Sequence, residues 1–449
     1  MSREHRASRW QVRGKDTLIR QWKPIARRIR PEKTDSFQLT GAVPASGAAF
    51  SFALYQSLGA RMKPGHHTSW LDNGSVFDAL VSEIERAEAS IHIVLYIWEA
   101  GVASDRVSAA LIERARAGVQ CRVLVDAVGS PDFERGLMPQ LEAAGCEVRI
   151  FRPLPGKDKL ARNHRKLVVC DGSVAITGGF GVRDNWLGDG TSAGAWRDAN
   201  VRFTGPAVAE AQLAFAENWQ EASGLLLPAS VFPQEGVPQL DAAPLAELAS
   251  AAFISSTGST LTRAERLIQL LIAAATQRIW IANAYFVPSR GIVELLCAKA
   301  RAGLDVRVLV PGKTSDSKTA FGAQHMEYGA MLKCGVRVWE YLPSMLHSKT
   351  MLVDEALVLV GSINLDPLSL SKLEEGALIA EDRVFAAELA EAFLRDCTHA
   401  QELTKHSSAG NSATLAPVET FMVKLFRMAF AGLLLGACAA GGIGGTACL

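Results

Sequence analysis

The sequence predicts an α/β fold made of two similar lobes, each with a mixed, parallel-rich sheet flanked by helices, related by a pseudo-twofold axis. The first observation is a His-x-Lys-x4-Asp pattern that occurs twice, from His164 to Asp171 and from His347 to Asp354. The two copies lie 183 residues apart (347 minus 164), and each continues into an apolar stretch and a turn of small residues. The second observation is that strand-like and helix-like segments alternate in the same order ahead of both copies, which is typical of α/β sheets.

Length and composition agree with a duplicated chain. With 449 residues, of which 49% are hydrophobic, the protein exceeds what one domain usually holds and can bury a large core. We expect a basic N-terminal segment over 1–65, a first lobe over 66–222, a linker over 223–260, a second lobe over 261–400 and a tail over 401–449. The linker is assigned from its many Pro, Ala, Ser and Gly residues.

The repeated elements can be followed in order. The predicted strands are 90–98, 121–126 and 147–151 in the first half and 278–286, 306–310 and 336–339 in the second. In each half a helix that ends in Arg-Ala-Gly lies between the first two strands, and a Leu-Pro loop leads from the third strand to the motif. This common order predicts that both motifs occupy equivalent positions.

Net charge and cysteine content restrict the class of protein. A net charge of +1 argues against a chain that coats nucleic acid, so no nucleic-acid partner is expected. The eight cysteines lie mostly in apolar surroundings, such as Cys121, Cys170 and Cys297, and none belongs to a Cys-x-x-Cys pair. We therefore expect reduced core cysteines in a cytoplasmic protein, and neither disulfides nor a metal site. The sequence leaves the oligomeric state open.

Both ends of the chain have a composition that suggests membrane contact. Ten Lys or Arg residues lie between Arg3 and Arg30, and apolar residues at 18, 22, 25 and 29 form one helical stripe beside them. This pattern suits a helix on an anionic bilayer, although a solvated basic tail has the same charge content. The run from Met428 to Leu449 is uncharged, but its six glycines disfavour a spanning helix. We expect no secretory signal, and a peripheral protein on the cytoplasmic face of the cell membrane with a possible C-terminal membrane contact.

The motifs resemble those of the phospholipase D superfamily, and more narrowly its bacterial cardiolipin synthase branch. The resemblance covers about residues 65–400 and rests on the duplicated motif, the Gly178-Gly179 and Gly361-Ser362 turns, Trp196-Arg197-Asp198 with Gly205-Pro206, and Gly361-Ser-Ile-Asn364-Leu-Asp366 followed by Glu374-Glu375. Two features depart from the pattern. Gly181 stands where the first turn often carries Asn, and we expect the chain to resemble the shorter, peripheral type, without the two N-terminal spanning helices of the longer synthases.

The residue types suit attack on a phosphodiester. Such a substrate is negatively charged, so the site needs a neutral imidazole as nucleophile and cations to offset charge on the phosphoryl oxygens. The candidates are His164 and His347 with Lys166 and Lys349, and Asn364 to donate hydrogen bonds. The resemblance implies that Asp198 orients His347, that Glu374 or Glu375 orients His164, and that the reaction passes through phosphohistidine. No metal or other cofactor is expected.

Other residues allow two interpretations. For Asp171 and Asp354 we favour a structural role at the end of a strand over a catalytic one. Asp126 and Asp316 either line the pocket or initiate loops, and Tyr96, Trp98, Tyr285 and Phe286 either wall the cleft or belong to the core. The remaining histidines are interpreted as ordinary surface or core residues, namely His66, His67, His92, His399 and His406.

We therefore expect an enzyme that transfers a phosphatidyl group from one phospholipid to the hydroxyl of another, with phosphatidylglycerol as the expected lipid. Its partners are anionic phospholipid substrates and the membrane surface. Only the resemblance assigns the nucleophile to His164. Three alternatives remain: a hydrolytic phospholipase D, a phosphodiesterase nuclease of the same superfamily, and a non-catalytic membrane-binding protein.

Overall fold

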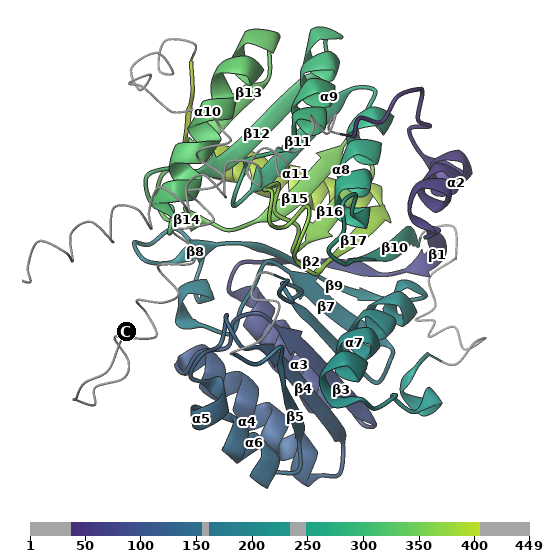
Figure 1. The fold of residues 1–449 in the computed structure, drawn as a ribbon, viewed down its shortest axis with the longest axis vertical. Coiled ribbons are helices and arrows are strands. Elements are labelled where there is room, and N and C mark those ends of the chain that lie inside the picture. Colours follow the sequence, from purple (N-terminus) through teal and green to yellow (C-terminus); the bar gives the residue numbers. More distant parts are fainter. Residues whose placement is uncertain (1–36, 155–160, 234–247, 405–449) are drawn as a thin grey trace, which may run out of the picture. The chain divides into compact units, whose positions relative to one another are not determined.

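The computed structural model describes residues 37–154, 161–233 and 248–404 (Figure 1). The predictions about the basic stripe before residue 31 and about the uncharged run after residue 427 lie outside these ranges. Within them, no helix is both long enough and apolar enough to cross a bilayer.

The first lobe contains a seven-stranded sheet with helices on it (Figure 1). The strands, in sheet order, are β2 (Thr68–Asp72), β9 (Ala199–Thr204), β7 (Val174–Gly178), β6 (Leu167–Cys170), β3 (Ser90–Leu95), β4 (Gln120–Asp126) and β5 (Glu147–Phe151). The helices are α3 (Ser75–Arg86), α4 (Val102–Arg116), α5 (Phe133–Gly136), α6 (Met138–Ala143), the 3₁₀ helix η2 (Asp184–Trp186) and α7 (Ala207–Ser223). The central strands β3, β6 and β7 are fully buried, as their nearly continuous apolar sequences require.

The second lobe repeats this arrangement and extends it at both edges. Its sheet order is β1 (Lys63–His66), β10 (Ala249–Ser256), β17 (Glu375–Glu381), β16 (Leu357–Gly361), β15 (Lys349–Val353), β11 (Arg278–Asn283), β12 (Asp305–Pro311), β13 (Arg337–Tyr341) and β18 (Ala400–Glu402). The helices of this half are α2 (Gly47–Leu58), α8 (Arg263–Ala274), α9 (Arg290–Arg301), α10 (Lys318–Cys334) and α11 (Arg383–Thr398), and η3 (Ala229–Val231) lies between the halves. From β10 to β13 the order matches that from β2 to β5, which confirms the duplication.

Both sheets are mixed, as predicted, but their parallel part is smaller than expected. Only β3, β4 and β5, and their counterparts β11, β12 and β13, pair in parallel within the repeated seven strands. The remaining four pairs in each repeat are antiparallel. The short turn after each motif accounts for one of these pairs, β6 with β7 and β15 with β16, since a few residues can join only antiparallel neighbours. The order of the strands in the sheet sets the others.

The two lobes share one layer of the hydrophobic core. Helices α7 and α11 contribute Phe215, Trp219, Phe385 and Phe393 to a buried cluster that also contains strand residues of both sheets. Separate clusters lie on the other faces, beneath α3 and α4 in the first lobe and beneath α8, α9 and α10 in the second. Because apolar burial is the main favourable term in folding, this common layer fixes the lobes against each other.

Chain segments outside the predicted lobes complete the second sheet. Within the predicted linker, Ala249–Ser256 form β10, which pairs with β17 on one side and β1 on the other. Strand β1 and helix α2 both come from the predicted N-terminal segment, and α2 packs against α8. The segment Ala-Ser-Ala-Ala-Phe-Ile-Ser-Ser does not alternate strictly between apolar and polar residues, so its place in the sheet depends on the neighbouring strands.

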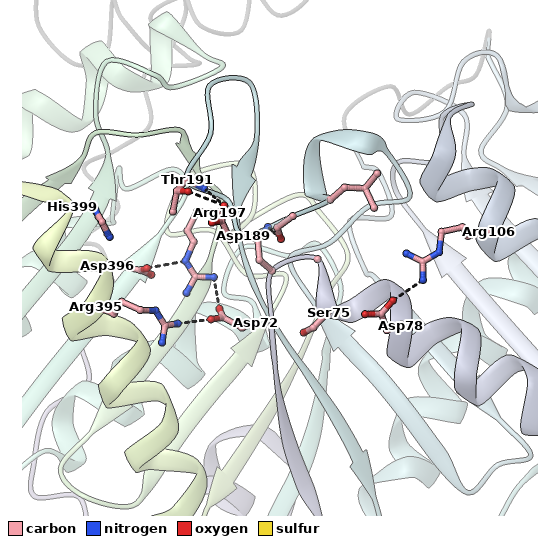
Figure 2. A pocket seen from close by; sticks show the side chains of 14 residues that line it. Asp72, Ser75, Asp78, Arg106, Asp189, Thr191, Arg197, Arg395, Asp396 and His399 are labelled. Carbon is pink, nitrogen blue, oxygen red and sulfur yellow. Dashed lines mark hydrogen bonds and ion pairs between the residues drawn. The ribbon is translucent and has the colours of Figure 1, made fainter.

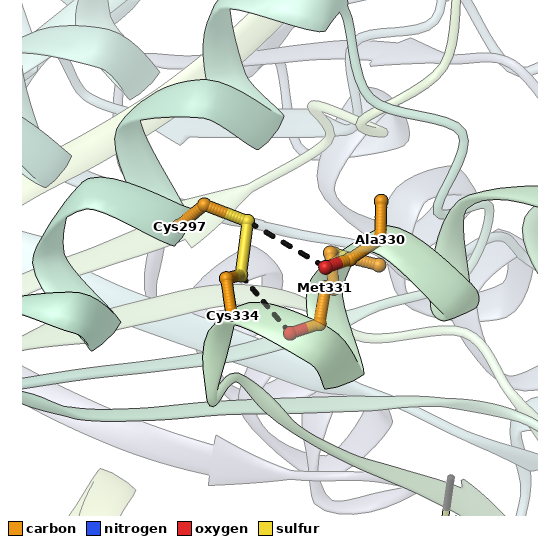
Figure 3. Close-up of a disulfide and its surroundings, with 4 residues drawn as sticks. All are labelled: Cys297, Ala330, Met331 and Cys334. Atoms are coloured by element: carbon orange, nitrogen blue, oxygen red, sulfur yellow. Dashed lines mark hydrogen bonds between the residues drawn. A yellow bond between two sulfur atoms is a disulfide. The ribbon is translucent and has the colours of Figure 1, made fainter.

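One prediction about the cysteines is wrong. Cys297 on α9 and Cys334 at the end of α10 form a disulfide, with their Cα atoms 5.3 Å apart (Figure 3). The two residues are separated by 37 positions, and only the packing of α9 against α10 brings them together. The other cysteines in the described ranges are free, with Cys121, Cys146 and Cys170 buried and Cys397 half-buried.

Candidate active site

Both motifs lie at the start of a central strand. His164 and Lys166 directly precede β6, and His347 and Lys349 stand at the start of β15. All four side chains are buried. The ammonium of Lys166 donates a hydrogen bond to the carbonyl of His164 at 2.7 Å, and Lys349 makes the same bond to the carbonyl of His347. The shared x-Lys spacing therefore folds each lysine back over its own histidine.

Each histidine is held by a carboxylate from the opposite lobe. Nδ1 of His164 lies 3.0 Å from Oε1 of Glu375, and Nδ1 of His347 lies 2.8 Å from Oδ2 of Asp198. Backbone pairing also connects the two lobes at this point. Asn163 forms a parallel bridge with Glu374, while β14 (Met345–Leu346) pairs in parallel with β8 (Trp196–Arg197). The two motifs thus form one site from reciprocal contacts between the lobes.

The two carboxylates have different additional donors. Glu375 accepts hydrogen bonds from the hydroxyls of Ser362 and Ser369. Asp198 accepts from the indole N–H of Trp186 at 2.7 Å and from the backbone N–H of Ala199 at 2.8 Å. Burial opposes ionisation of both groups, but the adjacent imidazole and these donors outweigh it and lower the pKa of each carboxyl. Both groups are therefore ionised carboxylates, and each accepts a hydrogen bond from Nδ1–H of the adjacent imidazole.

Burial keeps both imidazoles neutral in the absence of substrate. It lowers the pKa of His164, although Glu375 acts in the opposite direction, and it lowers the pKa of His347 to about 3, with Lys349 adding to the effect. When Nδ1 donates to the carboxylate, Nε2 of a neutral imidazole carries the free lone pair. Each histidine can therefore act as a nucleophile or a base through Nε2.

The surroundings of the two lysines disfavour their charged forms. Burial lowers the pKa of Lys349 to about 8 and that of Lys166 well below its usual value, and the charge of Lys349 contributes to the shift of Lys166. An anion between the lysines would relieve this repulsion and favour the charged ammonium groups. The arrangement suits a phosphate group, because its oxygens can accept from both lysines.

One aromatic ring from each lobe stands beside a histidine. The ring centre of Tyr96 lies 5.2 Å from that of His164, and the ring centre of Tyr285 lies 6.3 Å from that of His347. Of the four aromatic candidates, these two flank the site. Trp98 and Phe286 belong to the hydrophobic cores of the two lobes.

Asp171 and Asp354 have structural contacts. Both follow the motif strands with a φ of 53°, in the left-handed region that Asp tolerates better than most residues. The carboxylate of Asp171 accepts from the backbone N–H groups of residues 88, 89 and 90, and that of Asp354 accepts from those of residues 276, 277 and 278. These contacts attach the end of each motif strand to the start of the neighbouring strand and favour the structural interpretation.

Asn364 and Gly181 make the two halves of the site unequal. Asn364 is buried, and its Oδ1 atom has no hydrogen-bond partner among the described residues. A Cβ atom at Gly181 would lie 3.1 Å from the ring of Trp186 and 3.0 Å from Ile97. The indole therefore occupies the space that an Asn side chain would need in the first half.

Two further acidic candidates contact residues at the site. Asp126 accepts from the guanidinium of Arg162 and from the backbone N–H of Asn163, so it holds the segment before His164. Asp316 accepts a hydrogen bond from the hydroxyl of Tyr285 at 2.9 Å. Among the other histidines, His92 is buried against Gln212 and His66 accepts from a backbone N–H, while His406 lies outside the described residues.

Trp186, Ser369 and Asp366 are further residues of the site that were not predicted from the sequence. Burial raises the pKa of Asp366 to about 6, which places a titrating carboxyl close to Lys349. For Trp186 and Ser369 the repeat could have indicated the site, because the offset of 183 that relates the histidines also relates these two residues.

A cavity of about 650 Å³ lies behind β8 (Figure 2). In its wall, Arg197 pairs with Asp72 and Asp396, and Arg395 also pairs with Asp72. The carbonyl of Arg197 accepts the backbone N–H of His347 at 2.6 Å. These ion pairs fix β8, directly before Asp198, so the cavity wall supports the site from outside.

Comparison with known proteins identifies the family. The family described as "Cardiolipin synthase, PLD-like domain" matches residues 80–214 and 267–397, which correspond to the two lobes. Cardiolipin synthase 1 of Bacillus cereus is 31% identical over 79% of this chain and 71% of its own length. Cardiolipin synthase A of Pseudomonas putida is 30% identical over 86% of this chain and 78% of its own length.

A solved structure shows the same fold. Phosphatidylserine synthase of Haemophilus influenzae aligns with 86% of this chain and 98% of its own, with a TM-score of 0.62 and 15% sequence identity. At this identity the likeness concerns the fold alone. The sequence matches over both lobes, together with the duplicated motif, show that this chain belongs to the cardiolipin synthase family of phospholipase D-like enzymes.

Proposed function

We propose that this enzyme transfers a phosphatidyl group between lipid alcohols through a phosphohistidine. The observation that carries the proposal is the reciprocal pairing of His164 with Glu375 and His347 with Asp198 across the lobes. Two imidazoles oriented in this way can divide the work, one as nucleophile and one as general acid and base. The relatives named cardiolipin synthase support phospholipids as substrates, and phosphatidylglycerol is our expected donor.

In the first step, Nε2 of His164 attacks phosphorus and forms the P–N bond. The bond from phosphorus to the head-group oxygen breaks, and that oxygen takes a proton from Nε2 of His347. The substrate phosphate favours this protonated form, because its negative charge opposes the burial that otherwise lowers the pKa of His347. Lys166 and Lys349 donate to the phosphoryl oxygens and offset the charge that gathers there.

In the second step, the acceptor hydroxyl gives its proton to the now neutral His347 and attacks phosphorus. The P–N bond breaks, and His164 returns to its initial state. A second lipid as acceptor gives cardiolipin and a free alcohol, whereas water as acceptor gives phosphatidic acid. The buried positions of both histidines favour the lipid, because water must be kept from the intermediate.

The test uses the purified full chain with labelled phosphatidylglycerol, with and without phosphatidylethanolamine. We expect labelled cardiolipin, and rapid quenching in denaturant at mildly alkaline pH, where the P–N bond survives, should trap the label on the peptide that contains His164. The His164→Ala and His347→Ala variants should each lose turnover, while His399→Ala, at an exposed position, serves as control. Phosphatidic acid as main product would favour the hydrolase, label on the His347 peptide would exchange the roles, and near-normal turnover of His347→Ala would exclude the shared site.

We also propose peripheral attachment to the cytoplasmic face of the membrane. The support is the segment from Arg3 to Arg30, which contains ten basic residues and two tryptophans. Each Lys or Arg near an anionic surface contributes about 1 kcal/mol, so binding should be salt-sensitive. The protein should sediment with anionic vesicles, and deletion of residues 1–33 should weaken this binding while leaving turnover of detergent-solubilised lipid largely intact. Unchanged binding after the deletion would place the anchor elsewhere.

A further inference from the structure

The duplicated halves of the site differ most around the two carboxylates. The offset of 183 that relates His164 to His347 also relates Gly179 to Ser362 and Trp186 to Ser369. In the second half, Ser362 and Ser369 both donate to Glu375. In the first half, Gly179 has no side chain, and a Cβ atom there would collide with the Asp198 carboxylate. Asp198 therefore lacks the counterpart of one of the two hydroxyl donors.

Trp186 supplies the remaining donor. Its indole N–H lies 2.7 Å from Oδ2 of Asp198, the same oxygen that lies 2.8 Å from Nδ1 of His347. The ring of Trp186 also contacts the imidazole edge-on, with the ring centres 5.3 Å apart. The only other hydrogen bond to the carboxylate in the described structure comes from the backbone N–H of Ala199, to Oδ1.

The position of the indole is itself fixed. Trp186 is fully buried and packs against Trp196, with the ring centres 4.5 Å apart. The amide of Asn73 donates to the carbonyl of Gly188, just after the 3₁₀ helix, and its Oδ1 accepts the backbone N–H of Asp198. Gly181 leaves the space that the ring fills. The indole is therefore rigid enough to set the direction of the Asp198 carboxylate.

We propose that Trp186 is a positioning residue for His347, which acts by fixing the Asp198 carboxylate that holds the imidazole. Removal of the indole N–H leaves more negative charge on the oxygen that faces Nδ1. The Asp198 carboxylate then stabilises the imidazolium form of His347 more strongly. Its own orientation is no longer fixed by the indole. His347 should gain a higher pKa and lose its fixed orientation, while His164, held by Glu375 and two serines, should not change. The inference rests on the proposed role of His347 in catalysis.

The test compares three variants of the full chain by NMR of labelled histidine, with signals assigned from the His164→Ala and His347→Ala proteins. Trp186→Phe removes the N–H and keeps a ring. Ser369→Ala removes the equivalent donor from Glu375. The control is Trp98→Phe, because Trp98 is also buried in the first lobe and its indole N–H donates to Ser104 at 2.9 Å.

We expect Trp186→Phe to raise the pKa of His347 by about one unit and to lower kcat about tenfold with little change in KM, as for one lost charge-assisted hydrogen bond. Ser369→Ala should act on His164, and Trp98→Phe on neither histidine. If Trp186→Phe does not fold, Gly181→Ala provides the second variant, since its Cβ would press on the indole. An unchanged titration of His347 in the folded variant, or an equal shift in Trp98→Phe, would overturn the inference. Because the titration needs no substrate, this result is independent of whether the chain transfers phosphatidyl groups.

Discussion

Glu374 and Glu375 are neighbours in the sequence, but their side chains serve different partners. Glu375 lies 3.0 Å from Nδ1 of His164, whereas Glu374 forms ion pairs with Arg152 at 2.7 Å and with Arg165 at 3.2 Å. Successive side chains at the start of a strand point to opposite faces, so only one of the two can reach the histidine. The structure therefore separates two residues that the motif alone left equivalent.

The first prediction follows from this separation. Glu375→Gln keeps the size of the side chain but loses its charge, so we expect kcat to fall roughly 10²- to 10⁴-fold, as for other carboxylates that orient a catalytic histidine. Glu374→Gln should leave kcat of the folded enzyme within about threefold, but it should cost roughly 3 kcal/mol of unfolding free energy, because it weakens the pairing of the buried Arg165. Steady-state kinetics and urea unfolding of both variants check this. A larger loss of kcat in Glu374→Gln would contradict the assignment.

The second prediction concerns Asp354. Asp354→Ala leaves the backbone N–H groups of residues 276–278 without their acceptor and places Ala at a φ of 53°. We expect a loss of about 1–3 kcal/mol in unfolding free energy. Asp354→Asn should recover part of it, because Asn tolerates this φ and still offers an acceptor. Both variants, once folded, should turn over lipid at nearly the normal rate, and an inactive but fully stable Asp354→Asn protein would show a catalytic role instead.

The third prediction is a loss of stability in acid. Burial lowers the pKa of both His66 and His92 from 6.5 to about 4. Between these pH values the unfolded chain binds protons that the folded protein does not, so stability falls as the pH drops from about 6.5 to 4 and is unaffected above that range. For the fully buried His92 the loss is on the order of 3 kcal/mol.

Urea unfolding at several pH values checks the effect. His92→Gln should make the decline in stability between pH 6.5 and 4 shallower and leave the part due to the other buried histidines, whereas His399→Gln, at an exposed position, should leave it as it is. An equally steep decline in His92→Gln would show that other groups control the acid sensitivity.

The fourth prediction is the state of the cysteines. Alkylation of the unfolded protein without a reductant should leave Cys297 and Cys334 unmodified, and alkylation after reduction should modify both, as seen by mass spectrometry of their peptides. Closing a loop of this length stabilises the protein by about 4 kcal/mol in the chain-entropy model, so the Cys297→Ser, Cys334→Ser double variant should unfold at lower urea. Cys121→Ser provides the control for replacement of a buried, free cysteine. Full alkylation of both residues in the unreduced, unfolded protein would disprove the disulfide.

Sequence alone determined the duplication, the order of the main strands and the two His-x-Lys motifs. These features are local, because hydrophobic runs specify strands and the fixed spacing from His164 to Lys166 needs only one short segment. The same reasoning overestimated the parallel part of each sheet. Pairing direction depends on which strands become neighbours after the short turn that follows each motif, and this is decided by the assembled sheet.

The resemblance already implied the pairing of Asp198 with His347, but only the tertiary structure decided between Glu374 and Glu375 and added Trp186 to the site. The choice of Glu375 over Glu374, the contact between Trp186 and Asp198, and the disulfide between Cys297 and Cys334 all join residues that are distant in the chain or differ only in direction. The place of β10 beside β17 is of the same kind. Such contacts depend on how helices and strands pack within each lobe and between the lobes, and the free energy of that packing is spread over the whole buried core, so no short segment of the sequence specifies it.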